Sequence, residues 1–583
     1  MKYAARFLMA FFLYWSFCNA QQVNQQPRLT VIIVIDQFAY HYLYHIRPYF
    51  QHGFKKIFSE GIEYTNAYFP HGTTSTATGH AGLSTGTYAK EHGFIGNRWI
   101  DQHGNEIKCD DDRSGQAAIF SEDSNNILGK SAHFLMVDTL ADQFVLHGKL
   151  RNAYSFSLKS RAAIPTAGKL GKAIWFDDIT GHFTSSRAYF KQLPQWLLDF
   201  NKKQKQNIER PYFWDPCYDL NSAAYQSATK DSYLFVELDL PRINTLLTTP
   251  SKACAADHGQ SAGVRHRRIH TRQKAFLLTP AANQMLFDVT YAGLNQEILD
   301  KKNNEQALVW ICLSSLDKLG HFYGPQSFEI LDMIYHLDKQ LDDFMIKIQE
   351  QVGKDQVLFV LTADHGVAPL PELLQQAGYS GARRIRIDNL IVEMNYLIHE
   401  KFGIKDLIIG YKTPQFFLDN ARFEPLLPAQ REKIENSIKE YLRAQPGISR
   451  AWSFDELEKS CEKGHTRYLR DQLFKGRSGP ITILVEPYCI DTNWMYGTDH
   501  RAPYECNRHV PLVFYWPGRL AHKIVTDQVW TLQLASSLAL LLGIQKPSAS
   551  LFDPLPGLVI KDPRLPRTPA DLVSVPKSSP EDR

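Results

Sequence analysis

Six side chains of the kinds that bind metal ions are spread along most of the chain. Each lies close to one end of an apolar run. They are Asp36, Asp317, His321, Asp364, His365 and His500. Carboxylates and imidazoles in such a set suit zinc, with manganese or iron as alternatives. Their number is enough for two ions, with Thr76 as a possible seventh ligand. The residue types therefore predict a two-metal hydrolase.

The apolar runs explain how residues so far apart in sequence can meet. LTVIIVID ends at Asp36, ALVWICLSSLD ends at Asp317, and VLFVLTADHG contains Asp364 and His365. In an open α/β sheet the carboxyl ends of the strands form the ligand crevice, so these donors are expected at one sheet edge. His321, four residues after Asp317, shares its face if a helix follows the strand.

A segment dense in hydroxyls, HGTTSTATGHAGLSTG, offers a nucleophile for such a site. Its small residues indicate a turn that enters a helix. A hydroxyl at a helix N-terminus beside a metal ion is favoured as the alkoxide by the helix dipole and by the ion. Taken alone, these residues favour the alternative, a Ser/Thr-rich loop that only caps a helix.

Composition is that of an ordinary globular protein. The chain has 583 residues, of which 44% are hydrophobic and 22% charged, and its net charge of +4 gives no general argument for binding nucleic acid. Residues 1–20 carry two basic residues, an apolar stretch and a terminal Ala20, which predicts a cleaved secretory signal peptide. An uncleaved anchor is the alternative. The mature chain is expected in the periplasm or secreted, without a membrane span.

Strand and helix signals alternate along the chain without a linker that would divide it. We expect one catalytic domain over residues 21–553, as a monomer, with insertions at about 170–300 and 385–475. The first insertion is rich in aromatic residues, which favours a lid or cap. It contains a basic segment at 258–274, which fits a solvated surface loop, with an anion-attracting rim near the site as the alternative. The tail at 554–583 is rich in proline and is expected to be disordered.

Seven cysteines remain after removal of the signal peptide, so at least one is unpaired. Cys312 lies within an apolar run and is the best candidate for a buried free thiol. The other six lie in loop-like sequence where disulfides are possible. No CxxC spacing occurs, which argues against a thiolate zinc site.

The stretch TATGHAGLSTGTYAKEHGFIGNRWID resembles the nucleophile region of the alkaline phosphatase superfamily, whose pattern is TxPGHA followed by TG, HG and GN. The matching positions are Thr76, Gly79, His80, Ala81, Thr85, Gly86, His92, Gly93, Gly96 and Asn97. Two positions depart from the family pattern: Thr78 replaces a proline, and Arg501 replaces a glycine after His500. With Asp36, DKLGH, TADHG and HRAPY in the family order, the resemblance covers nearly all of residues 29–545.

Within the superfamily, the sequence most resembles the phosphate-irrepressible alkaline phosphatases, because of SLKSRAAIPTAG. Lys159 and Arg161 match a Lys-x-Arg pair that this branch uses to hold phosphoryl oxygens, and Asn97 matches a third oxygen ligand. Nucleotide pyrophosphatase/phosphodiesterases are less similar at these two basic positions. A monoester dianion has one more charged oxygen than a diester, which an ammonium and a forked guanidinium complement.

The resemblance implies a three-layer α/β sandwich, with a mostly parallel central sheet flanked by helices and with cap insertions. It also implies two zinc ions, one held by Asp36, Asp364 and His365, the other by Asp317, His321 and His500. Thr76 would attack a small-molecule phosphate monoester and form a phosphothreonine. A phosphodiesterase on the same site and an inactive secreted binding protein remain alternatives, whereas the lack of a CxPSR motif argues against a sulfatase.

Overall fold

The computed structural model describes residues 26–120, 129–209, 214–228, 272–299, 305–494 and 497–559. The expected signal peptide, most of the basic segment 258–274 and most of the tail 554–583 lie outside these ranges. In the described part, no helix is both long and apolar enough to cross a membrane.

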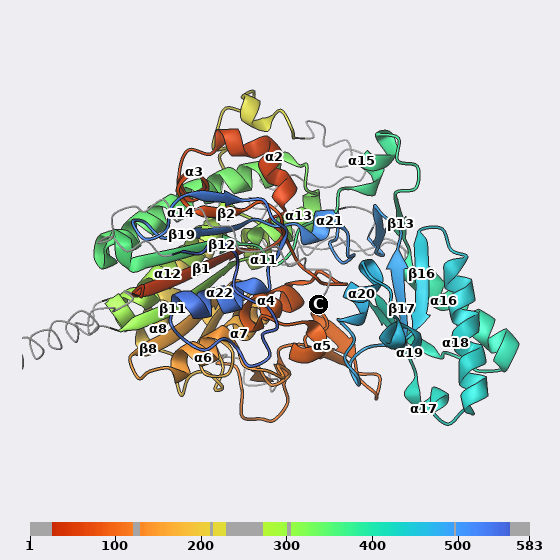
Figure 1. The fold of residues 1–583 in the computed structure, drawn as a ribbon. Helices are drawn as coiled ribbons and strands as arrows, with labels where there is room; N and C mark the ends of the chain where they lie inside the picture. Colours follow the sequence, from red (N-terminus) through yellow and green to blue (C-terminus); the bar gives the residue numbers. More distant parts are fainter. Residues whose placement is uncertain are drawn as a thin grey trace, which may run out of the picture.

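A nine-stranded sheet forms the centre of the described structure (Figure 1). Five of its strand pairs are parallel and three are antiparallel, so the sheet is mostly parallel as expected. The order across the sheet is β10 (His182–Thr184), β9 (Lys172–Asp177), β8 (Arg151–Ser157), β11 (Gln306–Leu313), β1 (Leu29–Ile35), β12 (Val357–Thr362), β19 (Leu512–Tyr515), β2 (Ile62–Tyr64) and β20 (Lys523–Val525).

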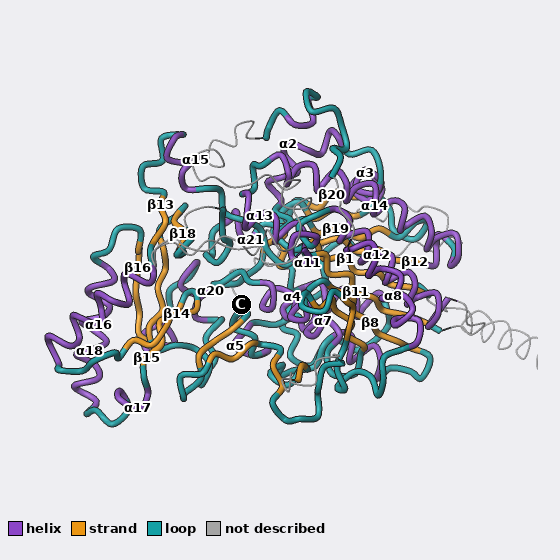
Figure 2. Tube along the Cα trace, turned by 180° about the vertical axis from the view of Figure 1, so that it is seen from behind, coloured by secondary structure: helices purple, strands orange, loops and turns teal. Residues whose placement is uncertain are grey.

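Helices cover the sheet and complete the three layers (Figures 1 and 2). One group that packs together is α3 (Gly53–Glu60), α12 (Pro280–Leu294), α13 (Ser315–Tyr323) and α14 (Phe328–Val352); another is α4 (Thr76–Thr85), α6 (Leu140–Leu146), α7 (Ser160–Ala167) and α22 (Gln533–Leu541). Strands β1 and β12 are buried along their whole length, which explains why their sequences are continuous apolar runs. The predicted fold class is confirmed.

A smaller unit lies beside the main sheet, at the right of Figure 1 and the left of Figure 2. Its four-stranded sheet has the order β14 (Ile408–Lys412), β15 (Gln415–Leu418), β17 (Ile481–Val485) and β16 (Ile448–Ser453), with α16 (Ile387–Phe402) and α18 (Pro428–Arg443) packed on it. It has a hydrophobic core of its own. The expected insertion at 385–475 forms part of this unit, which extends further to include β17.

The expected insertion at about 170–300 needs correction. Its first residues form β9 and β10, which belong to the central sheet, and its last described residues form α12, which packs on β8 and β11. Aromatic residues favoured a cap in the sequence, but here they fill the core: Trp175 and Phe183 are almost fully buried. Only the middle of the stretch, much of it outside the described residues, is left for a cap.

Six of the eight cysteines lie among the described residues, and all six are free. None of the possible disulfides therefore forms among the described residues. Cys312 is buried in β11, as expected for a free thiol. Cys254 lies outside the described residues.

Asp338, a fully buried carboxylate on α14, caps the start of α3. It accepts hydrogen bonds from the main-chain N–H groups of Gln51 (2.8 Å), His52 (3.0 Å) and Phe54 (2.7 Å). Because Asp338→Ala leaves three donors without this acceptor, we expect the free energy of unfolding to fall by roughly 3 kcal/mol. Urea unfolding measures this. Asp343→Ala, at an exposed position of the same helix, should change it little; similar losses in both variants would contradict the capping role.

Candidate active site

Three neighbouring strands bring three carboxylates to one edge of the central sheet. β11, β1 and β12 lie side by side and run in register to their carboxyl ends. The chain continues from these strands to Asp317, Asp36 and Asp364, which are at most 2% exposed. The expectation that strand ends gather the ligands therefore describes the arrangement found.

Asp36, Asp364 and His365 form one candidate metal-binding group. His365 Nε2 lies 3.3 Å from Asp36 Oδ1 and 3.4 Å from Asp364 Oδ2. These same three atoms are buried and have no hydrogen-bond partner among the described residues. Three converging, buried donor atoms without hydrogen-bond partners, of which only Asp364 Oδ2 also faces the His80 ring, fit a cation between them.

Asp317, His321 and His500, the second predicted triad, lie close together but are divided between two candidate groups, Asp317 with His365 and His500, and His321 with Asp499 and His500. His321 Nε2 lies 3.1 Å from Asp317 Oδ1 and 3.1 Å from His500 Nε2, and His500 Nε2 lies 3.4 Å from Asp317 Oδ1. The first two residues are four apart on α13, so the predicted helical spacing holds. The separations in both sets, 3.1 to 3.4 Å, are close to the roughly 3.3 to 3.5 Å between ligands of a tetrahedral zinc ion.

All three histidines present the correct nitrogen to an ion. Nδ1 of His321, His365 and His500 lies within hydrogen-bond distance of the main-chain oxygens of Thr498, Gly366 and Thr74, at 2.9, 3.0 and 2.6 Å. A carbonyl oxygen only accepts, so Nδ1 carries the proton. Nε2 of each ring then faces the clustered carboxylates as the unprotonated nitrogen, as outer hydrogen bonds arrange in metal sites.

The electrostatics of the cluster also call for cations. Burial and the carboxylates of Asp317 and Asp364 raise the pKa of Asp36 to about 8, and burial lowers the pKa of His365 to about 3. Several buried carboxylates in one place repel one another unless positive charge lies between them. The donor set and its charge therefore fit divalent metal ions.

The two groups are neighbours rather than separate sites. The rings of His365 and His500 stack with their centroids 3.5 Å apart. The ammonium of Lys159 bridges the groups, with Nζ 2.5 Å from Asp36 Oδ2 and an ion pair to Asp317. Any group held by Lys159 is consequently held between both candidate metal positions.

Thr76 is the first residue of α4 and is buried. Two contacts hold the start of this helix close to Asp364. A Cβ on Gly79 would lie 2.3 Å from the main-chain oxygen of Asp364, so only glycine allows this approach. His80 Nδ1, 2.8 Å from the main-chain oxygen of Thr76, is also 3.2 Å from Asp364 Oδ2.

Thr74 ties the same turn to the other group. Its main-chain oxygen accepts from His500 Nδ1, and its hydroxyl donates to the main-chain oxygen of His500. The turn before α4 is thus attached to His500 on one side and to Asp364 on the other. This arrangement places the N-terminus of α4, with Thr76 at its first position, beside both groups.

Lys159, Arg161 and Asn97 line one cavity of about 920 Å³ between the central sheet and the smaller unit. Lys159 directly precedes α7, and Arg161 Nε is buried without a hydrogen-bond partner among the described residues. Asn97 Oδ1 accepts from the main-chain N–H of Ala77 at 2.9 Å, which leaves its Nδ2 group as a donor. Three donors suited to phosphoryl oxygens therefore share the cavity.

The two departures from the family pattern have definite places. The hydroxyl of Thr78 donates to the main-chain oxygen of Phe94 (2.9 Å) and lies 3.0 Å from Ser75 Oγ, so side-chain hydrogen bonds fix the turn where a proline was expected. Arg501 lines the cavity and pairs with Asp499 at 3.1 Å. It joins the cavity wall and not the ligand set.

Two residues near the site were not predicted from the sequence. Asp499 belongs with His321 and His500 to a further candidate metal-binding group. Lys318 lines the cavity, and burial together with the cations of Lys159 and Arg161 lowers its pKa to about 8. Each directly adjoins a predicted ligand in sequence, which is the signal that could have identified them.

Gln37 was also missed, although it connects the two groups. Its Nε2 donates to Asp317 Oδ1 (3.1 Å) and its main-chain N–H donates to Asp364 Oδ1 (3.2 Å). The residue is fully buried with φ of 71°, a left-handed conformation that is costly for a non-glycine residue. Gly320 leaves room for it, because a Cβ there would lie 1.8 Å from Gln37 Oε1.

Gln37→Ala should weaken metal binding without removing a ligand. We expect the zinc concentration for half-maximal activity to rise about 10- to 100-fold, the usual effect of losing a partner that orients ligands. Activity titrated in zinc buffers measures this, with Gln116→Ala on an exposed loop as the control. An unchanged zinc requirement would show that Gln37 does not orient the ligands.

Comparisons with known proteins agree with this geometry. A model of the type I phosphodiesterase / nucleotide pyrophosphatase family matches residues 30–503. The alkaline phosphatase PhoV of Synechococcus elongatus is 28% identical over 553 residues, covering 93% of this chain and 94% of that protein. The alkaline phosphatase PafA of Elizabethkingia meningoseptica is 28% identical over 550 residues, covering 92% and 96%.

A solved structure of wild-type alkaline phosphatase PafA superimposes with a TM-score of 0.78 at 25% identity, covering 91% of this chain and 98% of that one. The chain therefore belongs to the type I phosphodiesterase / nucleotide pyrophosphatase family. The predicted resemblance to the alkaline phosphatase superfamily and the expectation of an enzyme are confirmed: the chain is a phosphatase of this superfamily.

Proposed function

We propose that this chain is a secreted, monomeric phosphatase that hydrolyses small-molecule phosphate monoesters through a phosphothreonine at Thr76. Zinc would be bound by Asp36, Asp364 and His365 and by Asp317, His321 and His500. The observation that carries the proposal is that both sets of residues lie beside the start of α4, which contacts Asp364 and His500, next to a cavity lined by Lys159, Arg161 and Asn97. Residues 1–20 would direct secretion as a cleaved signal peptide.

The residues divide the reaction between them. Thr76 Oγ1 attacks phosphorus from the N-terminus of α4, where main-chain N–H groups favour negative charge. Asn97 Nδ2, Arg161 and Lys159 hold the non-bridging oxygens as charge accumulates on them. Paired zinc ions, when bound, favour the threonine alkoxide and stabilise the leaving oxygen. The P–O bond to the alcohol breaks as the bond from Thr76 to phosphorus forms, and the alcohol leaves. A water molecule then attacks the phosphothreonine, which releases inorganic phosphate and restores the Thr76 hydroxyl.

Similarity to PafA supports the choice of these four residues. A solved variant of that alkaline phosphatase carries substitutions at a threonine, an asparagine, a lysine and an arginine. The spacings between those four positions equal the spacings between Thr76, Asn97, Lys159 and Arg161. The same four residue types thus recur here in the same order and register.

Phosphodiesterase activity at the same site is the second candidate, because the family includes phosphodiesterases. Lys159 and Arg161 discriminate between the two. Lys159→Ala or Arg161→Ala should lower kcat/KM for an aryl monoester about 10- to 100-fold, the effect of losing a hydrogen bond to a charged group. The matching diester, with one charged oxygen fewer, should lose less. Steady-state kinetics on both esters measures this.

Lys169→Ala is the matched control, since Lys169 is exposed just after α7 and should leave both reactions unchanged. Equal losses on monoester and diester in the Lys159 and Arg161 variants would reject the monoesterase assignment in favour of the diesterase.

A further inference from the structure

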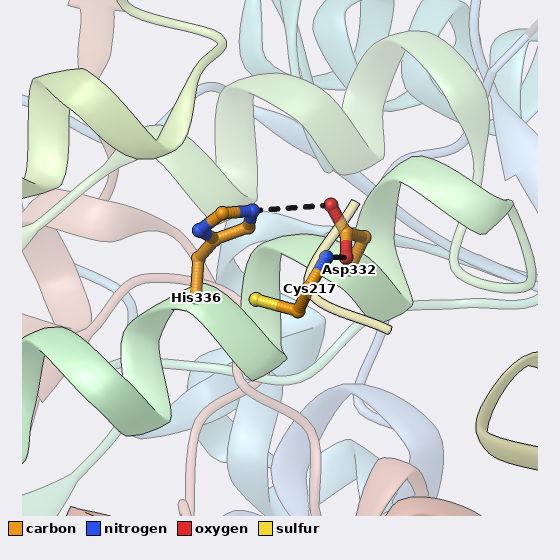
Figure 3. A group of neighbouring side chains, drawn as sticks. All are labelled: Cys217, Asp332 and His336. Atoms are coloured by element: carbon orange, nitrogen blue, oxygen red, sulfur yellow. Dashed lines mark hydrogen bonds and ion pairs between the residues drawn. The ribbon is translucent and has the colours of Figure 1, made fainter. Parts of the chain in front are cut away.

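A second kind of ligand cluster lies outside the cavity described above, on helix α14. Figure 3 shows Asp332 and His336 with Cys217, whose sulfur points toward the space beside the other two side chains. Their donor atoms all lie within 4.8 Å of one another. None of the three residues lines the 920 Å³ cavity.

The geometry of the cluster is that of a small metal site. Asp332 and His336 are four residues apart on α14, so both side chains leave the same face. His336 Nε2 lies 3.3 Å from Asp332 Oδ2, close to the separation of ligands on a tetrahedral zinc ion and within the 3.1 to 3.4 Å range of the two catalytic groups. His336 Nε2 also lies 3.0 Å from the main-chain oxygen of Asp215, a contact in which the ring N–H donates, so an ion must replace this proton to bind Nε2.

Asp332 is held by the same kind of outer hydrogen bonds that orient metal-ligating carboxylates. Trp214 Nε1 donates to its Oδ2 at 2.5 Å, while Tyr225 O–H (2.5 Å) and the main-chain N–H of Cys217 (2.8 Å) donate to its Oδ1. Asp332 is fully buried. Oδ1 already accepts two hydrogen bonds, whereas Oδ2 accepts that of Trp214 and contacts His336, so an ion that replaces the His336 proton could bind Oδ2 while the other bonds fix the carboxylate.

The chemistry of the donors selects the ion. A thiolate, an imidazole and a carboxylate together suit zinc, whereas calcium and magnesium require oxygen ligands. Binding would release the proton of the Cys217 thiol and any proton on His336 Nε2. Without an ion, the same residues form an ion pair between His336 and Asp332 beside a free thiol.

We propose that Cys217, Asp332 and His336 form a third metal site, for zinc, which fastens residues 214–228 onto α14. The site is separate from the catalytic groups, which contain no sulfur ligand among the described residues. Its role is structural, because it joins residues 214–228 to a helix that lies about 100 residues later in the sequence, and because none of its residues lines the cavity.

Metal content and cobalt spectroscopy of the full-length protein test the proposal. We expect three zinc ions per wild-type chain, and two in Cys217→Ser with phosphatase activity unchanged. Replacing zinc by Co²⁺ should produce a near-ultraviolet thiolate-to-cobalt charge-transfer band, lost in Cys217→Ser. Cys461→Ser, which removes an exposed free thiol, is the matched control and should keep the band and the third ion.

His336→Gln should lose the third ion as well. This second variant shows that the loss is not caused by a folding defect specific to Cys217→Ser. Wild-type protein with two zinc ions per chain and no thiolate–cobalt band would overturn the proposal and leave the ion pair as the function of the cluster. A band that persists in Cys217→Ser would overturn it equally, because the sulfur would then belong to another residue.

Discussion

Thr76→Ala is expected to abolish turnover while the protein keeps its full zinc content. The loss in kcat should be about 10⁴-fold or more, since removing a catalytic nucleophile costs this much even where binding and charge stabilisation remain. Phosphate release from an aryl monoester, measured together with zinc per chain, gives both numbers.

The expectation follows from the place of Thr76 at the start of α4. The helix is fixed to Asp364 through Gly79 and His80, and the turn before it is fixed to His500 through Thr74. None of these contacts uses the Thr76 side chain, so the alanine variant should retain the ligand geometry. Loss of activity with retained zinc would then isolate the chemical role of the hydroxyl.

Thr85→Ala is the matched control, because it removes a hydroxyl from the other end of the same helix. That hydroxyl only donates to the main-chain oxygen of Ala81 (2.7 Å), and its loss should change kcat by less than about tenfold. Substantial activity in Thr76→Ala would mean that water attacks the ester directly, and that the phosphothreonine does not form.

Removing the metal ions should also abolish turnover, by at least about 10³-fold, and zinc should restore it. Without cations, the buried carboxylates of Asp36, Asp317 and Asp364 repel one another, so the chelated protein should also melt at a lower temperature. Activity and melting temperature, measured before chelation, after it and after adding zinc back, test both effects.

Asp36→Ala makes the same test for one group alone. It should lower the zinc content by one ion and lower kcat by a similar factor, while Asp343→Ala on the exposed side of α14 should change neither. Full activity after exhaustive chelation would exclude a metal-dependent mechanism.

Much of the site could be predicted because it depends on local rules. Apolar runs that end in Asp36, Asp317 and Asp364 are buried parallel strands, and parallel strands gather their ends at one edge. The four-residue spacing of Asp317 and His321 fits one turn of α13. These features can be predicted from the spacing of residues along a helix and from the direction of the parallel strands.

Other features depend on contacts between distant segments. Gln37 has its role only because Asp317 and Asp364 lie on either side of it, and its left-handed φ has no signal in a glutamine. The aromatic residues of the stretch that begins with β9 predict a cap, but aromatic residues are common in cores as well as in lids. The stretch lies in the core because β9 pairs with β8. Amino-acid composition alone does not predict this pairing.

Cys217 illustrates the same limit. Absence of a CxxC spacing argued against a thiolate zinc site, yet the proposed third site combines one cysteine with an Asp–His pair four residues apart on α14. The pair has the same spacing as Asp317 and His321. Only the packing of residues 214–228 on the helix adds the thiol.

The most direct test of the proposed function is the kcat/KM of the purified wild-type protein for an aryl phosphate monoester and for the matching diester, measured with zinc present. The cations of Lys159 and Arg161, held with Asn97 around one cavity, should favour the monoester by about 100-fold, the effect of one or two hydrogen bonds to a charged oxygen. Equal or faster turnover of the diester would contradict the account.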